Sequence, residues 1–291
     1  MQEQTLAVQR MQAYIDAHLF GRITLADLAG ACHYSPWYAY RLFTQWLRRT
    51  PAEYIRKLRL TRSAWMLRET GRTVADVAFA VGFQSVDGYQ RAFHAEFGCN
   101  PSQYAARPMP LYLFTPYPPY LPNEQKENHM NSTSIIFVQP MAKPERKVLI
   151  KRGIQAADYM QYCEEVGCDI WGYLTSVPNA LEAPMGLWLP SAMTPQGTSS
   201  YVQGVALAVS AGAQIPEGFD LITLPAATYL QFQGEPFAEE DYAEAIDTVW
   251  AAIRKYDPAQ HGYEWDASQP RIQLEPIGSR GYIEWVPVRP L

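Results

Sequence analysis

The 291-residue chain has few cysteines and no long apolar run, and both shortages limit what it can be. Its four cysteines show neither CxxC spacing nor a cysteine–histidine ligand pattern, so we predict no metal site and reduced thiols in a cytoplasmic protein. No apolar run reaches about 18 residues, which argues against a transmembrane helix. The polar start MQEQTLAVQRMQAYIDAH lacks the apolar core of a signal peptide. We also find no motif for a cofactor.

The net charge of −5 conceals two halves of opposite sign. Residues 1–108 hold 13 lysines and arginines against 8 aspartates and glutamates, a balance of +5. Residues 109–291 hold 11 against 21, a balance of −10. The basic first half would be attracted to the phosphates of nucleic acid, whereas the acidic second half would be repelled by them. The charge therefore predicts two domains with different partners, the partner of the first being nucleic acid.

A proline-rich stretch followed by a polar run separates the halves, at residues 108–133. Proline lacks the backbone N–H and disfavours helix in the residue before it, so this stretch reads as a partly extended, partly flexible linker. We predict a first domain over residues 1–107, which has helical periodicity, and a second over residues 134–291, which is richer in β-type runs.

The first domain contains a repeated helix-turn-helix pattern. TLADLAGACHYSPWYAYRLF (24–43) and TVADVAFAVGFQSVDGYQRAF (73–93) both begin with threonine and have aspartate three residues on, which matches a capping box. A tight turn is predicted at His33 in the first copy and at Gly82 in the second. A serine N-cap then opens the second helix of each copy. The pattern predicts two short helix pairs.

A longer helix is predicted between the copies, over residues 51–69, where apolar residues fall at helical spacing. Nineteen residues at 1.5 Å each give a rod of about 28 Å. Successive major grooves on one DNA face lie about 34 Å apart. One chain can therefore place both helix pairs near adjacent grooves without dimerising.

This layout resembles the AraC/XylS family of transcription regulators, within it the MarA/Rob branch, over residues 5–107. The string VGFQSVDGYQRAFHAEFGCNPSQY (81–104) carries the resemblance, because a Gly-Phe turn, a serine cap, an Arg-Ala-Phe end and an FG…NPSQY close occur in that order. The resemblance implies double-stranded promoter DNA and RNA polymerase as partners, a nucleoid-associated protein, and reading helices at 36–47 and 86–97.

Outward positions of the reading helices are the expected base contacts: Trp37, Tyr40, Arg41, Gln90 and Arg91. Expected contacts with the DNA backbone are Ser35, Arg48, Arg49, Arg56 and Ser85. Arginine can bind guanine and glutamine can bind adenine through paired hydrogen bonds. Alternatively, either arginine ties its helix to its own domain, and Trp37 belongs to the core. Asp87 repels phosphate and Gly88 weakens the second reading helix. The first helix-turn-helix copy is therefore expected to carry more of the base specificity.

The acidic half is predicted to be an α+β domain. Expected helices cover residues 156–176 and 239–256, the second with a marked apolar stripe. Expected strands cover 134–140, 147–153, 185–192, 201–209, 227–235, 271–276 and 282–288. This order resembles the GyrI-like fold, which implies two pseudo-repeated βαββ-type halves around a groove. Such domains often bind lipophilic, frequently cationic, small molecules.

Aromatic rings and carboxylates suit that chemistry, because ring faces attract cations and a carboxylate supplies the opposite charge. The expected effector-binding residues are Trp171, Tyr173, Tyr229, Phe232, Trp265, Gln273, Glu275, Tyr282, Glu284 and Trp285. Either Gln273 or Glu275 occupies the position where the family often has a glutamate, and Gln273 there would weaken a cation preference. Alternatively, individual aromatics are plain core and Glu284 lies on the outer face of its strand.

The leading hypothesis is a non-enzymatic transcription regulator whose acidic domain binds a small-molecule effector and thereby alters promoter occupancy. A second hypothesis is a hydrolase of reactive small molecules, in which Glu275 or Glu284 with Trp171 activates water. The sequence contains no nucleophile elbow, metal or phosphate-loop motif that would support it. A third hypothesis is constitutive DNA binding, with an acidic domain that serves only stability or sequestration.

Overall fold

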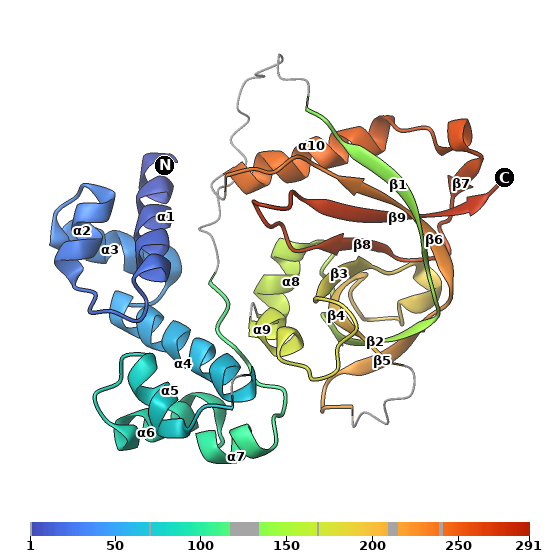
Figure 1. The fold of residues 1–291 in the computed structure, drawn as a ribbon. Coiled ribbons are helices and arrows are strands. Elements are labelled where there is room, and N and C mark those ends of the chain that lie inside the picture. Colours follow the sequence, from blue (N-terminus) through green and yellow to red (C-terminus); the bar gives the residue numbers. More distant parts are fainter. Residues whose placement is uncertain (1, 70, 117–133, 168, 209–214, 239–240) are drawn as a thin grey trace. The chain divides into compact units, whose positions relative to one another are not determined.

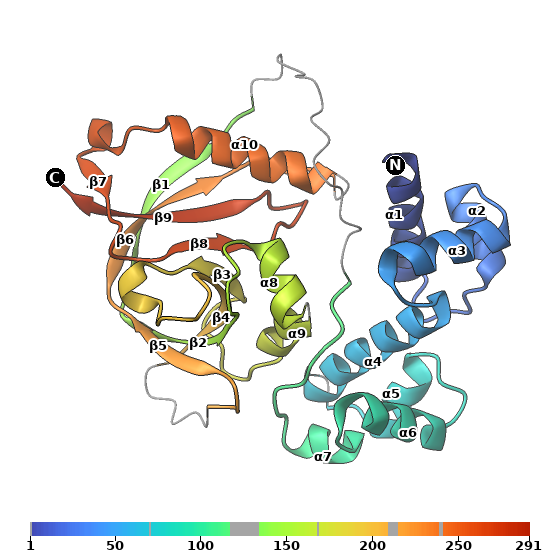
Figure 2. The same ribbon diagram turned by 180° about the vertical axis from the view of Figure 1, so that it is seen from behind.

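The computed structural model describes residues 2–69, 71–116, 134–167, 169–208, 215–238 and 241–291. The chain divides into two compact units, Met1–His129 and Met130–Leu291. The first is helical and the second is built on an antiparallel sheet (Figures 1 and 2). A helical unit followed by a unit of sheet and helices is the architecture that the sequence predicts.

The helical unit is organised on the long helix α4. The chain forms α1 (Gln2–Ala17), α2 (Leu25–Cys32), α3 (Pro36–Leu47), α4 (Pro51–Glu69), α5 (Val74–Ala80), α6 (Val86–Phe97) and α7 (Pro101–Ala106). Helix α3 packs against α4 on one side of the unit, and α5, α6 and α7 pack against it on the other. Figure 1 shows α4 running between the two groups. The bounds of α3, α4 and α6 confirm the predicted helices.

Local hydrogen bonds explain where the repeated helices begin. At α2, Thr24 accepts from the backbone N–H of Asp27 at 3.2 Å and its own N–H donates to the Asp27 carboxylate at 2.7 Å, which completes a capping box. At α5, Thr73 accepts from the backbone N–H of Asp76, but the Asp76 carboxylate accepts from the Thr73 hydroxyl instead of its N–H. The second capping box is therefore only half formed, contrary to our expectation.

Both predicted turns adopt the left-handed backbone conformation, with φ of 60° at His33 and 84° at Gly82. Ser35 then accepts from the N–H of Tyr38, and Ser85 accepts from the N–H of Gly88. Each serine thereby satisfies one backbone N–H that the start of a helix leaves without a partner. The chain consequently turns sharply into α3 and α6 at predictable residues.

Replacing His33 by glycine is expected to raise the free energy of unfolding of the helical unit by about 0.5–1 kcal/mol. A residue with a Cβ is strained at a φ of 60°, and glycine is not. Denaturant unfolding of the full chain measures the change, with Gly82→Ala as the matched variant that should lose stability at a similar φ. A His33→Gly chain that is no more stable than the original would contradict the interpretation.

Two hydrophobic clusters hold the helical unit together, one for each helix pair. Phe43 and Tyr54 meet edge-to-face in the first, and Phe93 lies in the second with Tyr104. The segment after α7 contributes to both clusters, because Phe114 packs on Tyr54 in the first and Leu111 and Leu113 lie in the second. Phe114 also donates its backbone N–H to the Thr61 hydroxyl at 2.9 Å. The described part of the predicted linker thus packs against α4; residues 117–133 of that linker lie outside the described residues.

The second unit contains nine strands in one sheet among its described residues. They are β1 (Phe137–Lys143), β2 (Arg146–Arg152), β3 (Met185–Trp188), β4 (Tyr201–Leu207), β5 (Asp220–Leu224), β6 (Ala227–Gln233), β7 (Tyr263–Trp265), β8 (Arg271–Leu274) and β9 (Ile283–Pro290). The helices are α8 (Tyr159–Val166), α9 (Asp169–Thr175) and α10 (Tyr242–Lys255), with short 3₁₀ turns η1 (Ser191–Met193) and η3 (Pro258–His261).

The strand order is β1-β6-β9-β8-β3-β4-β2-β5, with β7 paired to β9, and it contains one structural repeat twice. In the first repeat the order along the chain is β2, α8, α9, β3 and β4, and β4 lies between β2 and β3 in the sheet. In the other repeat the order along the chain is β6, α10, β7, β8 and β9, and β9 lies between β6 and β8 in the sheet. The two repeats join where β3 pairs antiparallel with β8. The middle of the sheet therefore consists of four strands, β9 and β8 from one repeat and β3 and β4 from the other.

Two local features of this unit differ from our predictions. The helix expected over 156–176 is two helices, α8 and α9; α8 ends at Gly167, where φ is 98°. The strands β5 and β7 were not predicted, because both are short and lack a clear apolar alternation. The predicted strand 201–209 and helix 239–256 each include residues outside the described ones, namely 209 and 239–240.

Candidate nucleic-acid interface and candidate effector site

The outer face of α3 presents aromatic and basic side chains to solvent. Trp37 is 68% exposed and Tyr40 is 42% exposed, although large aromatic residues are usually buried. The Arg41 guanidinium lies 4.8 Å from the centre of the Trp37 ring and 5.0 Å from that of Tyr38. These cation–π contacts hold Arg41 at the surface of α3. The alternative that Trp37 belongs to the core is therefore wrong.

The outer face of α6 is more mixed in charge. Gln90, Arg91 and Asp87 are exposed there and line a shallow cleft together with His94 and Asn100. The structure explains why glycine occurs at position 88 within α6: a Cβ there would lie 2.9 Å from the Ser85 hydroxyl oxygen. The glycine leaves room for the helix cap.

The residues expected to contact the DNA backbone fall into two groups. Ser35, Ser85, Arg48 and Arg56 are exposed, although both serine hydroxyls already serve as helix caps. Arg49 is engaged within the unit: it pairs with Glu53 at 3.2 Å and stacks over the Phe114 ring at 5.5 Å. The Arg49 guanidinium must leave or share these partners to reach phosphate.

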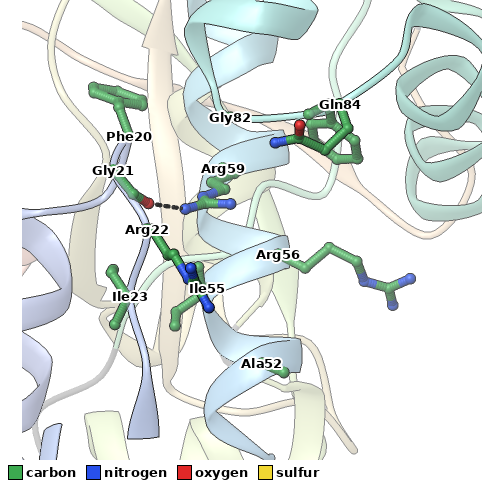
Figure 3. A pocket seen from close by; sticks show the side chains of 11 residues that line it. Phe20, Gly21, Arg22, Ile23, Ala52, Ile55, Arg56, Arg59, Gly82 and Gln84 are labelled. Carbon is green, nitrogen blue, oxygen red and sulfur yellow. Dashed lines mark hydrogen bonds between the residues drawn. The ribbon is translucent and has the colours of Figure 1, made fainter. Parts of the chain in front are cut away.

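A cleft of about 640 Å³ lies over the first half of α4, between the α1–α2 connection and the turn that joins α5 to α6 (Figure 3). Arg22 and Arg56 are exposed at this cleft and give it a basic character. Arg59, by contrast, is engaged within the unit: it donates hydrogen bonds to the backbone carbonyl oxygens of Leu19 at 2.8 Å and Gly21 at 2.5 Å. Burial lowers the pKa of Arg59 below its usual value. Arg59 therefore ties the α1–α2 connection to α4.

In the second unit, a carboxylate is buried under α10. Glu284 on β9 is 0% exposed, and its Oε2 accepts from Trp250 Nε1 at 2.6 Å and from the Tyr282 hydroxyl at 2.9 Å. Its Oε1 accepts from the Nε of Arg271. The alternative that Glu284 lies on an outer face is wrong. All three donors are side chains of this chain, and together they satisfy both carboxylate oxygens.

Two tryptophan rings complete this arrangement. The Arg271 guanidinium lies 4.9 Å from the ring centre of Trp188 and 5.7 Å from that of Trp250. We call Trp188, Trp250, Arg271, Tyr282 and Glu284 the Glu284 cluster. Burial lowers the pKa of Arg271 and raises that of Tyr282, whose hydroxyl is also held by its hydrogen bonds. The cluster is a cation held between aromatic rings and against a carboxylate.

Strand register extends the cluster across the sheet. Glu284 lies opposite Phe232 on one side and Gln273 on the other, and Gly186 lies opposite both Gln273 and Gln203. Side chains in such a row share one face of the sheet. A Cβ at Gly186 would lie 2.2 Å from the Tyr201 hydroxyl oxygen, so the glycine makes room for that ring.

Two polar groups in this region are buried without a hydrogen-bond partner among the described residues. They are the Tyr201 hydroxyl and both amide atoms of Gln203, and both residues are fully buried. Burial raises the pKa of Tyr201 well above its usual value, so the hydroxyl keeps its proton and can donate. Unsatisfied buried polar groups are rare in proteins, and these two are available to a ligand atom or a water molecule.

The structure brings together four of the ten predicted effector-binding residues: Phe232, Gln273, Tyr282 and Glu284. Gln273, on β8, lies opposite Glu284, so its amide shares one face of the sheet with that carboxylate. Glu275 lies beyond the end of β8 and is exposed.

Most of the other predicted aromatic residues lie away from the Glu284 cluster. Tyr229 and Trp285 pack in the cluster on the opposite face of the sheet, because Trp285 directly follows Glu284 in its strand. Tyr173 stacks on Phe219 under α9, and Trp171 is buried on α9. Trp265, on β7, lies opposite Val288 and so on the Glu284 face of the sheet, with its ring centre 6.4 Å from that of Phe232. Sequence reasoning placed these rings by type, and alternation along each strand decides which face they occupy.

Sequence reasoning missed Trp188, Trp250 and Arg271 as site residues, and also Tyr201 and Gln203. Trp250 was visible only as part of the apolar stripe of α10. Arg271 opens a predicted strand whose next residues are Ile272 and Gln273, and an alternating pattern places Arg271 on the same face as Gln273. That alternation is the one signal that could have predicted Arg271 beside Glu284. Among the described residues, no group of three or more acidic, histidine or cysteine side chains could hold a metal ion.

Two capped helix pairs on one rod, each with an exposed polar second helix, define a double helix-turn-helix DNA-binding protein. A family model described as a helix-turn-helix domain matches residues 28–107. The regulatory protein SoxS of Salmonella typhimurium is 35% identical over 100 residues, which are 34% of this chain and 94% of SoxS. The chain belongs to the family of AraC-type helix-turn-helix transcriptional regulators. These sequence matches leave most of the second unit uncovered.

Two solved structures show weaker similarity. An AraC-type transcriptional regulator from Chromobacterium violaceum aligns with 35% of this chain and 95% of its own at 24% identity, with a TM-score of 0.33. The structure of SAV2435 bound to tetraphenylphosphonium aligns with 53% of this chain and 94% of its own at 17% identity, with a TM-score of 0.37. In the described part of the chain, no helix has the length and apolar character to cross a membrane.

Proposed function

We propose that this regulator is controlled by a small molecule: its second unit binds a lipophilic, cationic effector at the Glu284 cluster, and binding changes how the helical unit occupies promoter DNA. The buried Glu284 carboxylate carries the proposal. A buried carboxylate is costly unless it is paired, and here the aromatic rings around it suit a cation. The doubled strand–helix–strand–strand topology supports a GyrI-like effector domain.

On DNA, we propose that α3 reads bases through Trp37, Tyr40 and Arg41, and that α6 adds contacts from Gln90 and Arg91. The exposed aromatic and basic face of α3 supports the first part of this proposal, because its side chains can reach base edges in a major groove. The remaining backbone contacts would come from Ser35, Arg48, Arg49, Arg56 and Ser85. Contact with RNA polymerase belongs to the same proposal.

The hydrolase hypothesis is weaker. A general base needs a carboxylate oxygen able to take a proton from water, whereas both oxygens of Glu284 already accept hydrogen bonds and one is paired with Arg271. Glu275 is exposed at the end of β8. Incubation of candidate ligands with the full chain, followed by mass spectrometry, separates the hypotheses: an altered mass would favour the enzyme.

The proposed control by a cation can be tested with DNA that the full chain selects from a random-sequence pool. Tetraphenylphosphonium serves as the lipophilic cation, its binding is measured by calorimetry, and footprinting measures occupancy of the selected DNA. We expect the cation to bind and to change DNA affinity at least about threefold, with both effects weakened in Glu284→Gln. Binding without any change in occupancy would refute the switch and favour a constitutive DNA binder.

A further inference from the structure

We infer that Arg271 is a built-in occupant of the effector site, so that a cationic ligand enters the Glu284 cluster only by displacing the Arg271 guanidinium. This inference builds on the proposed effector-binding function. It concerns which molecules the site accepts, and it assigns Arg271 the role of a specificity-determining residue.

The contacts of Arg271 are those that a bound planar cation would make. Its Nε donates to the Glu284 carboxylate, and its guanidinium lies over the rings of Trp188 and Trp250 at 4.9 and 5.7 Å. Flat, delocalised cations favour stacking on aromatic faces and hydrogen bonding to carboxylates. The charge of Glu284 is thus already neutralised, and an incoming cation competes with a tethered one.

Arg271 is placed so that it can leave while Glu284 cannot. Its side chain is 35% exposed and that of Glu284 is 0% exposed. Arg271 is the first residue of β8 and lies beyond the β8–β9 pairing, which consists of Ile272 with Trp285 and Gln273 with Glu284. Rotation about its side-chain bonds can carry the guanidinium into water while the strand stays paired.

This arrangement selects for charge. A neutral ligand that displaced Arg271 would leave Glu284 buried and uncompensated, which is strongly unfavourable. A cation that displaces Arg271 restores the pairing, and the freed guanidinium regains its hydration. The expected ligands are therefore aromatic amidinium or guanidinium compounds, which match the shape and charge of the group they replace.

The test compares benzamidinium with benzamide, two molecules of nearly the same shape that differ in charge, by calorimetric titration of the full chain. If Arg271 occupies the site about nine-tenths of the time or more, its removal strengthens apparent binding about tenfold or more. We expect Arg271→Ala to bind benzamidinium about tenfold more tightly than the original chain, with no such gain for benzamide. Arg289→Ala is the matched control, because Arg289 pairs with Glu264 at the surface and should leave binding unchanged.

Thermal unfolding shows whether each variant is still folded and whether it binds the ligand. Arg271→Ala leaves Glu284 unpaired, so benzamidinium should raise its Tm more than that of the original chain, and the effect should vanish in Arg271→Ala/Glu284→Gln. Arg271→Met, which keeps the aliphatic stem, should show the same gain in affinity as Arg271→Ala.

Equal or weaker benzamidinium binding in both variants would overturn the inference, as would an absence of binding in every chain. Failure of the switch is a separate result. Cation binding that leaves DNA occupancy unchanged refutes the proposed control but not the role of Arg271.

Discussion

A chain carrying Glu284→Ala is expected to lose about 3–5 kcal/mol of the free energy of unfolding of its second unit. The substitution removes the acceptor for three donors at once, Trp250 Nε1, the Tyr282 hydroxyl and Arg271 Nε. Each buried donor left without a partner costs about 1–3 kcal/mol. Three such penalties sum to about 3–9 kcal/mol, and we place the loss in the lower part of this range because Arg271 can turn toward solvent.

Tryptophan fluorescence during urea unfolding reports mainly on the second unit and measures this loss. Five of the eight tryptophans lie in the second unit: Trp171, Trp188, Trp250, Trp265 and Trp285. Glu284→Gln should lose less, because an amide oxygen still accepts from Trp250 or Tyr282. Glu264→Ala, which removes a surface carboxylate paired with Arg289, is the control that should change stability little. A Glu284→Ala chain as stable as the original would mean that the cluster is not held by the carboxylate.

Arg41→Ala is expected to weaken binding to a selected DNA site by about 1–3 kcal/mol, or roughly 5- to 150-fold. Arg41 is exposed on α3, and its cation–π contact with Trp37 holds the guanidinium in position beside that ring. Arg91→Ala should cost less, because Asp87 lies on the same exposed surface of α6 and, among the described residues, no aromatic ring holds the Arg91 guanidinium through a cation–π contact. Gel-shift titrations against selected and scrambled DNA give both affinities.

Arg56→Ala is the matched control for that experiment. Arg56 lines the basic cleft over α4 and is expected to contact phosphate. Its loss should weaken binding to all sequences alike and reduce the salt dependence by about one ion. If Arg41→Ala also weakens selected and scrambled DNA to the same extent, Arg41 contacts the backbone and the assignment of base reading to α3 is wrong.

Three helices of the first unit, α3, α4 and α6, were predictable to the residue, and the signals at their ends are local. A serine or threonine cap, a left-handed turn and proline at a first helical position each act within about four residues of the helix end they define. Ser35 with Pro36 starts α3, and Gly98 with φ of 71° ends α6. Where the second capping box failed, the difference was a single hydrogen bond at Asp76, which sequence cannot specify.

The site in the second unit was less predictable because it depends on register between distant strands. Glu284 and Tyr282 could be singled out by type, but their neighbours come from β3, β8 and α10, which are separated from β9 by up to about a hundred residues. A shift of one residue in any pairing would place Trp188 or Arg271 on the opposite face. Tyr229 and Trp285 show the same effect in reverse, since both have suitable chemistry and occupy the other face.

We propose that α3 and α6 both read DNA, and their fixed order along α4 then has a consequence for promoters. A symmetric dimer binds a palindrome and looks the same from either end, but α3 and α6 differ in charge and in their exposed side chains. The DNA site of a single chain therefore has a direction, because its two ends contact different helices. Reversing the site without changing its sequence would turn the bound protein around relative to the start of transcription, and the response of the gene should depend on that orientation.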